Sequence, residues 1–298
     1  MIYHVLAFLT ILVWGSTFVS TKVLLDKGLT PSDIFLLRFT LAYVGMALAS
    51  HKHWRCHNLR DELIMMIAGI TGGSMYFFTE NMALLYAKTG NVSLIVCLAP
   101  LITAILAITR KNRESVSRRL WIGSLLALTG VAFVVNGENG SNSHPLLGHL
   151  LALTAAGSWA IYQTIIKPLG KRYGSGMLTR KVFGYGVLTI IPLWWSTLPD
   201  SLSNHLGSAL QDSTVIANIL YLGLLASWIC FWLWSKIIGN LGPVIASNYI
   251  YLNPLVTCVV SYFVLDESIT LPMCLGGLCI LMGVYMAVGM PKPHLKVH

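Results

Sequence analysis

The feature that most constrains this chain is a series of long apolar runs separated by short loops, which carry most of the charge. A transmembrane helix needs about 20 mostly apolar residues. Hydrophobic residues make up 55% of the 298 positions and charged residues only 10%, whereas soluble domains carry about 25% charged residues. We therefore predict an all-α integral membrane protein of ten transmembrane helices. Their expected ranges are 3–25, 34–50, 63–87, 91–109, 120–137, 146–167, 178–197, 214–236, 243–265 and 271–289.

Basic residues occupy alternate loops, which predicts the orientation in the membrane. One set of loops and the C-terminal tail hold Lys52, Arg55, Arg60, Arg110, Lys111, Arg113, Arg118, Arg119, Lys171, Arg172, Arg180, Lys181, Lys292 and Lys296. The other loops hold only Lys27 and Lys88, together with most of the acidic loop residues. Because cytoplasmic loops are enriched in Lys and Arg, both termini are expected in the cytoplasm, with the chain in the cell (inner) membrane. An even number of helices agrees with this placement.

The sequence repeats itself between its two halves. Four matches occur in the same order in each half. The pair Trp14 and Lys22 matches Trp159 and Lys167, and the pair Arg38 and Tyr43 matches Arg180 and Tyr185. Pro100 matches Pro254, and Glu114-Ser115-Val116-Ser117 matches Glu267-Ser268-Ile269-Thr270. We expect repeats at 1–137 and 146–298, joined by a linker loop at 138–145. Each repeat has five predicted helices, an odd number, so the second enters the membrane from the opposite side. Inverted repeats are a common plan in secondary transporters.

These motifs resemble the EamA family of the drug/metabolite transporter superfamily. The resemblance rests on Trp14-Gly15-Ser16-Thr17-Phe18, on Arg38-Phe39, and on the glycines that follow each glutamate, Gly123 and Gly130 in the first half and Gly276 and Gly283 in the second. It implies a ten-helix exporter of amino acids, other small metabolites or drugs. It also implies a central cavity lined by the first, third, fourth, sixth, eighth and ninth helices. Two similar inverted halves could adopt each other's conformation, which would give alternating access to that cavity.

Three charged residues fall inside predicted spans, where charge is costly. They are Lys22, Arg38 and Glu80. Glu80 is a candidate to bind a proton or the amine of a substrate, because burial disfavours the charged carboxylate. Tyr76 precedes Glu80 by four residues and shares its helix face. The alternative for all three charges is a structural ion pair or a side chain that reaches the membrane surface.

Proline and polar residues point to the fourth and ninth helices. Pro100 and Pro254 interrupt helical hydrogen bonding at matching places, so both are candidate hinges. Polar residues near them are too polar to face lipid, and we take as candidate ligands Asn91, Asn248, Tyr249, Tyr251 and Asn253. Some of these must instead bond between helices, and Asn91 is also placed to cap its helix.

Aromatic residues complete the candidate site. Trp159, Tyr162, Trp228 and Trp232 fall in helices expected to line the cavity. Their rings suit apolar or aromatic solutes, and cations through the ring face. The alternative is the belt of aromatic residues at the membrane surface.

Other classes of function lack the required pattern. The formal charge of +9 is spread over loops between apolar runs, which argues against nucleic-acid binding. No Walker loop, H-E-x-x-H or G-x-S-x-G motif is present, so we predict no enzyme activity, no cofactor and no metal site. The leading hypothesis is a secondary transporter for a small molecule, with proton coupling and a homodimer left open. The alternatives are a polytopic membrane enzyme, a non-transporting membrane protein and a channel.

Overall fold

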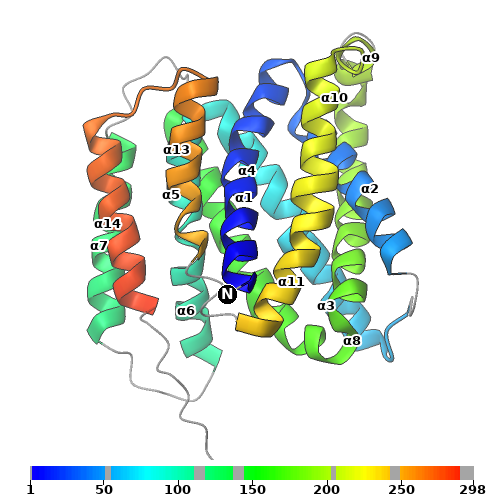
Figure 1. Cartoon of the computed structure of the whole chain (residues 1–298), viewed down its shortest axis with the longest axis horizontal. Helices are drawn as coiled ribbons and strands as arrows, with labels where there is room; N and C mark the ends of the chain where they lie inside the picture. Colours follow the sequence, from blue (N-terminus) through cyan, green and yellow to red (C-terminus); the bar gives the residue numbers. More distant parts are fainter. Residues whose placement is uncertain are drawn as a thin grey trace, which may run out of the picture.

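The computed structural model describes residues 2–50, 55–110, 118–136, 144–202, 206–241 and 249–288. Within these ranges the regular structure is entirely helical. The helices run up and down beside one another and are joined at the two ends of the molecule (Figure 1). This arrangement confirms the predicted all-α membrane class.

The first half of the chain begins with two uninterrupted helices, and several shorter helical segments follow them. Its elements are α1 (Ile2–Asp26), α2 (Pro31–Ala49), α3 (Leu59–Gly69), the π-helix η1 (Ile70–Ser74), α4 (Met75–Tyr86), α5 (Thr89–Val96), α6 (Ala99–Arg110) and α7 (Arg118–Asn136). A capping box fixes the start of α2, since Thr30 and Asp33 each accept a hydrogen bond from the other's backbone N–H.

The second half begins with a long helix that bends. Its elements are α8 (Pro145–Leu202), α9 (Leu206–Ala209), α10 (Ser213–Leu220), the π-helix η2 (Tyr221–Ile229), α11 (Cys230–Leu241), α13 (Asn253–Val264) and α14 (Leu271–Val288). Gly174 interrupts α8 with a φ of 76°, a left-handed conformation that favours glycine. The predicted sixth and seventh helices lie on either side of this glycine.

Four helical stretches are long and apolar enough to cross a bilayer. They are Ile2–Asp26, Pro31–Ala49, Leu59–Tyr86 and Ser213–Trp234. The outer surface is apolar, with large exposed side chains at Phe8, Trp121, Leu125, Leu128, Phe263, Leu271 and Leu278. Charged and polar side chains such as Arg38 and Glu80 are instead buried. This distribution suits a protein surrounded by lipid, in which exposed polar groups are costly.

The predicted fourth and ninth helices are not continuous, which corrects the ranges 91–109 and 243–265. α5 ends at Val96 and α6 begins at Ala99, so Pro100 is the second residue of α6. Pro254 is likewise the second residue of α13. Proline has no N–H to donate, and the first turn of a helix is the place where that loss costs least. The residues 242–248 lie outside the described ranges.

The predicted third and eighth helices each contain a π-helical segment, η1 and η2. Each segment has a carbonyl oxygen that accepts a side-chain hydrogen bond from the other half of the chain. Ser158 Oγ donates to Thr71 O in η1 at 2.7 Å, and Trp14 Nε1 donates to Ala226 O in η2 at 3.0 Å. These bonds satisfy buried carbonyls inside the bundle.

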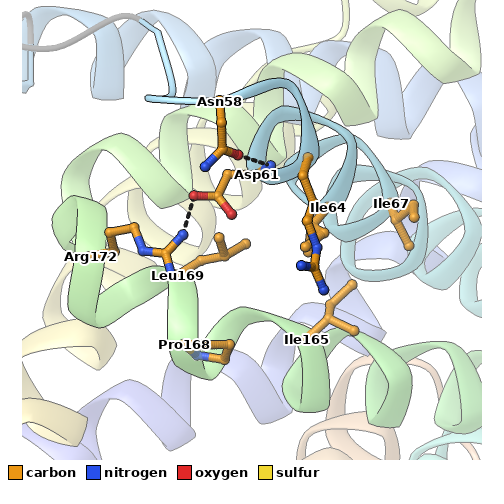
Figure 2. A pocket seen from close by; sticks show the side chains of 9 residues that line it. Asn58, Asp61, Ile64, Ile67, Ile165, Pro168, Leu169 and Arg172 are labelled. Atoms are coloured by element: carbon orange, nitrogen blue, oxygen red, sulfur yellow. Dashed lines mark hydrogen bonds and ion pairs between the residues drawn. The ribbon is translucent and has the colours of Figure 1, made fainter.

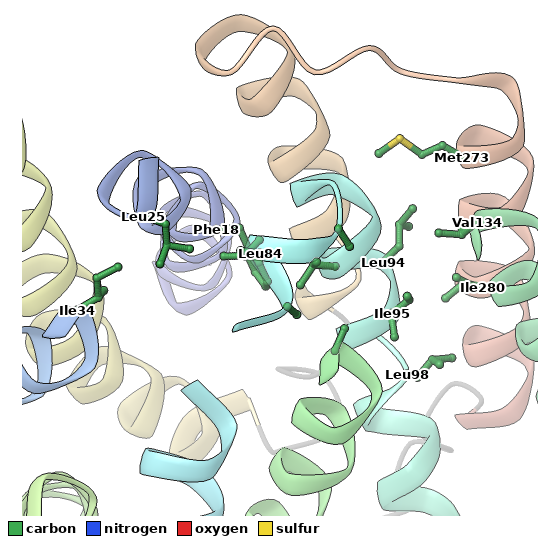
Figure 3. Packing of buried hydrophobic residues seen from close by; sticks show 14 of the residues in the cluster. Phe18, Leu25, Ile34, Leu84, Leu94, Ile95, Leu98, Val134, Met273 and Ile280 are labelled. Atoms are coloured by element: carbon green, nitrogen blue, oxygen red, sulfur yellow. The ribbon is translucent and has the colours of Figure 1, made fainter. Parts of the chain in front are cut away.

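Buried apolar side chains from both halves form a shared core (Figure 3). Phe18 and Leu25 of α1, Leu84 of α4 and Ile95 of α5 belong to it, as does Ile280 of α14. All five are 6% exposed or less. The two halves are therefore packed against each other along the middle of the molecule.

α7 and α14 pack closely through the repeated glycines, and they lie side by side at one edge of the molecule (Figure 1). A Cβ added to Gly130 would lie 2.5 Å from Gly276 O, and one added to Gly276 would lie 2.6 Å from Gly130 O. A Cβ on Gly283 would lie 2.5 Å from Gly123 O. Only glycine permits backbones to come this close.

One helix start in the first half is capped by the second half. The carboxylate of Glu267 accepts hydrogen bonds from Thr89 N (2.9 Å), Thr89 Oγ1 (2.7 Å) and Gly90 N (3.4 Å). These amides belong to the first turn of α5, where backbone N–H groups have no helical partner. The connection between α13 and α14 is thus fastened to α5.

Candidate functional site

The candidate site is centred on Glu80, which is buried inside the bundle. Glu80 is 2% exposed and projects from α4. The Tyr76 hydroxyl, one helical turn earlier, hydrogen-bonds its carboxyl group. Among the described residues, no group hydrogen-bonds the other carboxyl oxygen, Oε2. A buried oxygen in this state costs free energy, so it calls for an explanation, and a bound proton or ligand would supply one.

Arg38 supplies the positive charge of the site. It is 3% exposed, lies in α2 and interacts electrostatically with Glu80. Its Nε donates a 2.6 Å hydrogen bond to Ser227 Oγ in η2, and its guanidinium carbon lies 4.4 Å from the centre of the Phe77 ring. The three polar groups therefore come from α2, α4 and η2, which belong to both halves.

Aromatic rings form one wall beside this charged centre. The Trp159 ring lies 4.9 Å from the Tyr76 ring and 5.0 Å from the Tyr162 ring. Phe231 lies edge-on to Trp159 at 6.3 Å. Trp159 and Tyr162 are three residues apart on α8 and so share a helix face, and this face is turned toward Tyr76 of α4. The predicted residues Tyr76, Trp159 and Tyr162 are thus brought together.

The polar residues of the ninth helix lie next to its break. Tyr251 precedes α13 and Asn253 is its first residue. Among the described residues, neither the Tyr251 hydroxyl nor Asn253 Oδ1 has a hydrogen-bond partner, although both atoms are buried. Tyr249 differs, because its hydroxyl bonds His4 Nδ1 at 2.7 Å. Asn248 lies outside the described residues.

The remaining predicted residues have other neighbours. Lys22 forms an ion pair with Asp26 at 2.9 Å on its own helix. Asn91 is buried in the first turn of α5, next to the two residues that Glu267 caps. Pro100 and Pro254 mark the two helix breaks described above. None of these side chains has a described contact with Glu80.

Two of the predicted aromatic residues also point elsewhere. The Trp228 ring packs on Gly45 of α2, where an added Cβ would lie 2.4 Å from it. Trp232 is 40% exposed, and Lys236 Nζ lies 3.6 Å from the centre of its ring. This exposed cation and ring pair is typical of the membrane surface, which was the alternative for these aromatic residues.

Sequence reasoning missed Ser227 and Phe231, which complete the site. Both stand in the apolar run of the eighth helix and carry no charge that would single them out. The available signal was the cost of burying Arg38, because a buried guanidinium needs acceptors. A hydroxyl in a cavity-lining helix is one of the few groups that can supply them.

The arrangement can hold a small molecule that carries both charges. A guanidinium binds carboxylates, a buried carboxylate binds an ammonium group or a proton, and aromatic faces pack on apolar groups. The described residues contain no group of three or more side chains that could hold a metal ion.

Known proteins match this chain over nearly its whole length. The model of the EamA-like transporter family matches residues 1–136 and again 146–289. A probable terminal-alkyne amino-acid exporter of Streptantibioticus cattleyicolor is 28% identical over 87% of this chain and 84% of its own. A probable amino-acid metabolite efflux pump of Escherichia coli is 24% identical over 95% of this chain and 94% of its own.

A solved crystal structure shares the fold. It superposes with a TM-score of 0.62 and 19% identity, and the alignment covers 96% of both chains. The family match is independent of this likeness and covers both halves. The chain is a multi-pass membrane transporter and not an enzyme, and it belongs to the EamA-like transporter family.

Proposed function

We propose that this protein is a secondary transporter that exports amino acids or related small metabolites by alternating access. The observation that carries the proposal is the buried Glu80 carboxyl group beside Arg38, with one oxygen free for a proton or a ligand. The two relatives named above are described as exporting amino acids or their metabolites, which supports this substrate class.

In this proposal the substrate is bound at both of its charged ends. Arg38 binds the carboxylate, and Glu80 binds either the ammonium group or a coupling proton. Trp159 packs against the side chain of the substrate. Proton binding and substrate binding at one carboxyl group would exclude each other, and this competition would couple export to proton entry.

Ten membrane-spanning helices in two inverted repeats, 1–137 and 146–298, provide the mechanical basis. The contacts between α7 and α14 support the inversion. Gly123 and Gly276 are equivalent by sequence, as are Gly130 and Gly283, yet Gly130 meets Gly276 and Gly123 meets Gly283. Equivalent positions exchange partners in this way when two equivalent helices are antiparallel and related by a two-fold axis. In addition, a side chain of each half donates to a π-helical carbonyl of the other, Ser158 to Thr71 O and Trp14 to Ala226 O.

A polar network would close the cytoplasmic end. Asp61 of α3 accepts hydrogen bonds from Arg172 and from the Tyr173 hydroxyl (2.6 Å). Its neighbour Glu62 accepts from Lys181 and from the Tyr185 hydroxyl. These bonds join α3 to α8, one from each half, at the end of the molecule where the N-terminus lies (Figure 1). In the proposed orientation both termini lie on the cytoplasmic side of the inner membrane, so this network would be the inner gate.

The test is transport by the purified protein in liposomes, with a panel of amino acids and a pH gradient. The pH-driven part of transport by Glu80→Gln is expected to fall at least about tenfold, as expected for loss of a positioned proton-binding group. Glutamine still accepts the Tyr76 hydrogen bond, so the thermal unfolding temperature is expected to stay close to that of the wild type.

The matched control is Asp26→Asn, which removes an exposed carboxylate from α1. It is expected to keep the pH-driven transport. Unchanged coupling in Glu80→Gln would overturn the role of Glu80, and failure of the wild type to move any amino acid would overturn the substrate class.

A further inference from the structure

A second site lies far from Glu80, in a pocket between α3 and α8. The pocket has a volume of about 630 Å³ and is lined by Asn58, Arg60, Asp61, Ile64, Ile67, Ile165, Pro168, Leu169 and Arg172 (Figure 2). Ile64 and Glu80 are 16 residues apart on the same helical stretch, which is about 24 Å at 1.5 Å per residue. The pocket is therefore separate from the proposed transport site.

The polar part of the pocket is basic at its mouth. Arg60 is exposed, and the Arg172 side chain is 54% exposed. The single acidic group, Asp61, is 6% exposed and already pairs with Arg172. A guanidinium has five N–H donors, so Arg172 keeps donors for another partner. Two guanidinium groups against one paired carboxylate leave a net positive charge at the mouth.

The wall of the pocket is apolar. Ile64 and Ile67 are three residues apart on α3, and Ile165 and Leu169 are four apart on α8, so each pair shares a helix face. Ile67 is 44% exposed on the outer surface of the molecule. The basic mouth lies at the start of α3 and at the bend of α8, and the apolar wall continues from it into the membrane-spanning part of both helices.

We propose that this pocket binds an anionic phospholipid of the cytoplasmic leaflet. Its phosphate lies between Arg60 and Arg172, which suit a phosphate through two N–H donors each, and an acyl chain lies along Ile64, Ile67 and Ile165. Basic pockets between transmembrane helices on the cytoplasmic side suit such headgroups. The choice of leaflet rests on the orientation given under the proposed function.

A free phosphate ion fits the pocket less well than a lipid, because most of the lining side chains are apolar. Burying those side chains under an acyl chain contributes about 25 cal/mol for each Å² removed from water, and an inorganic ion gains none of this. A zwitterionic lipid offers the same chains and lacks the net negative charge. Selectivity for an anionic lipid is therefore the expected property.

The experiment measures lipid binding to the intact purified protein by native mass spectrometry. Detergent solutions receive dioleoyl phosphatidylglycerol or dioleoyl phosphatidylcholine at increasing concentration. The wild type is expected to bind phosphatidylglycerol about tenfold more tightly than phosphatidylcholine, and Arg60→Gln to lose most of that preference. Inorganic phosphate at about 10 mM is expected not to displace the lipid. The ion makes only the ionic contact, with a dissociation constant in about the millimolar range, whereas the lipid binds through its headgroup and its acyl chain together.

Two matched controls separate the pocket from general effects. Arg119→Gln removes the same charge from an exposed position on α7 and is expected to bind like the wild type. Ile67→Trp should fill the pocket and weaken binding, whereas Leu63→Trp adds the same ring at a 48% exposed position of α3 outside the pocket lining. Both positions face outward, so both variants are expected to fold.

Several results would overturn the proposal. They are equal binding of the two lipids, equal losses in Arg60→Gln and Arg119→Gln, or displacement of the lipid by inorganic phosphate. The binding measurement does not require transport. A wild type that binds phosphatidylglycerol selectively and moves no substrate would refute only the proposed function, and the reverse result would refute only the lipid site.

Discussion

At the scale of single residues, the polar groups of this protein serve two different purposes. Arg38 and Glu80 are buried inside the bundle, where charge is expensive, and we propose that they bind the substrate. Lys27 and Asp212 form an exposed pair at 2.8 Å that joins the α1–α2 connection to the start of α10. Pairs of the second kind contribute little at neutral pH, yet they make stability depend on pH.

Asp212 provides a pH-dependent prediction. The hydrogen bond from Lys27, followed by that from the Thr214 backbone N–H, holds the pKa of Asp212 below its ordinary value of 3.8. A carboxylate with a lowered pKa in the folded state stabilises the fold above 3.8, and this contribution is lost as the pH falls through the folded-state pKa. The unfolding temperature of the wild type in detergent is expected to drop between pH 5 and pH 3 more than that of Asp212→Asn.

The substitution is chosen so that only the charge changes. Asparagine at Asp212 can still accept the Thr214 N–H bond that caps α10. Asp266→Asn is the control, because it removes an exposed acid at a φ of 54° that asparagine adopts readily. An identical pH dependence in the wild type and Asp212→Asn would contradict the prediction.

How far the sequence predicts the site depends on charge. Arg38, Glu80 and Tyr76 could be identified because a charged residue inside an apolar run has a high energetic cost and few explanations. Ser227 could not, because a hydroxyl in a helix can satisfy itself by bonding its own backbone. Lys22 was a candidate for the same reason as Glu80, and its partner Asp26 one turn away was visible in the sequence.

At the scale of elements, the close contact of α7 and α14 depends on glycine. A Cβ on Gly283 would lie 2.5 Å from two backbone atoms of α7, and backbone cannot move aside as a flexible side chain can. Forcing such a contact typically costs about 1–3 kcal/mol. Gly157 of α8 is also helical, and nothing lies within 4 Å of the position its Cβ would take.

We therefore expect Gly283→Ala to lower the unfolding temperature by several degrees, since about 1–3 kcal/mol is lost at the helix contact. Gly157→Ala is the matched control and is expected to be neutral or stabilising, because alanine has the higher helix propensity. The measurement is thermal unfolding of the purified protein in detergent. Equal unfolding temperatures for the two variants would show that the α7 and α14 contact is looser than described.

The elements themselves were only partly predictable. The breaks before α6 and α13 are predictable from proline, because proline lacks the N–H that a continuous helix needs. The π-helices η1 and η2 have no such marker. Thr71 O and Ala226 O within them accept hydrogen bonds from Ser158 and Trp14, and these donors are far away in the sequence.

At the scale of the whole molecule, the inverted arrangement that we propose would place matched loops on opposite sides of the membrane. Ser115 and Ser268 occupy equivalent positions of the two repeats. Ser115 lies outside the described residues, and Ser268 is exposed beside Lys88, on the connection between α13 and α14. A two-fold axis in the membrane plane requires these two serines to lie in different compartments.

Cysteine labelling in intact cells tests this requirement. The six native cysteines are first replaced, and Ser115→Cys and Ser268→Cys are then introduced one at a time. A membrane-impermeant maleimide is expected to label Ser268→Cys in intact cells and Ser115→Cys only after the cells are opened. The parent without cysteines should stay unlabelled. Labelling of both variants from the same side would contradict the inverted repeat, and it would contradict the proposed mechanism as well.

The cap that Glu267 places on α5 has a consequence for biosynthesis. Thr89 leaves the ribosome 178 residues before Glu267, so the first half is inserted while the amide groups at this helix end still lack their acceptor. The start of α5 gains its carboxylate acceptor only when the segment that carries Glu267 is in place. We therefore expect a chain truncated before Glu267 to insert its first half with the start of α5 uncapped.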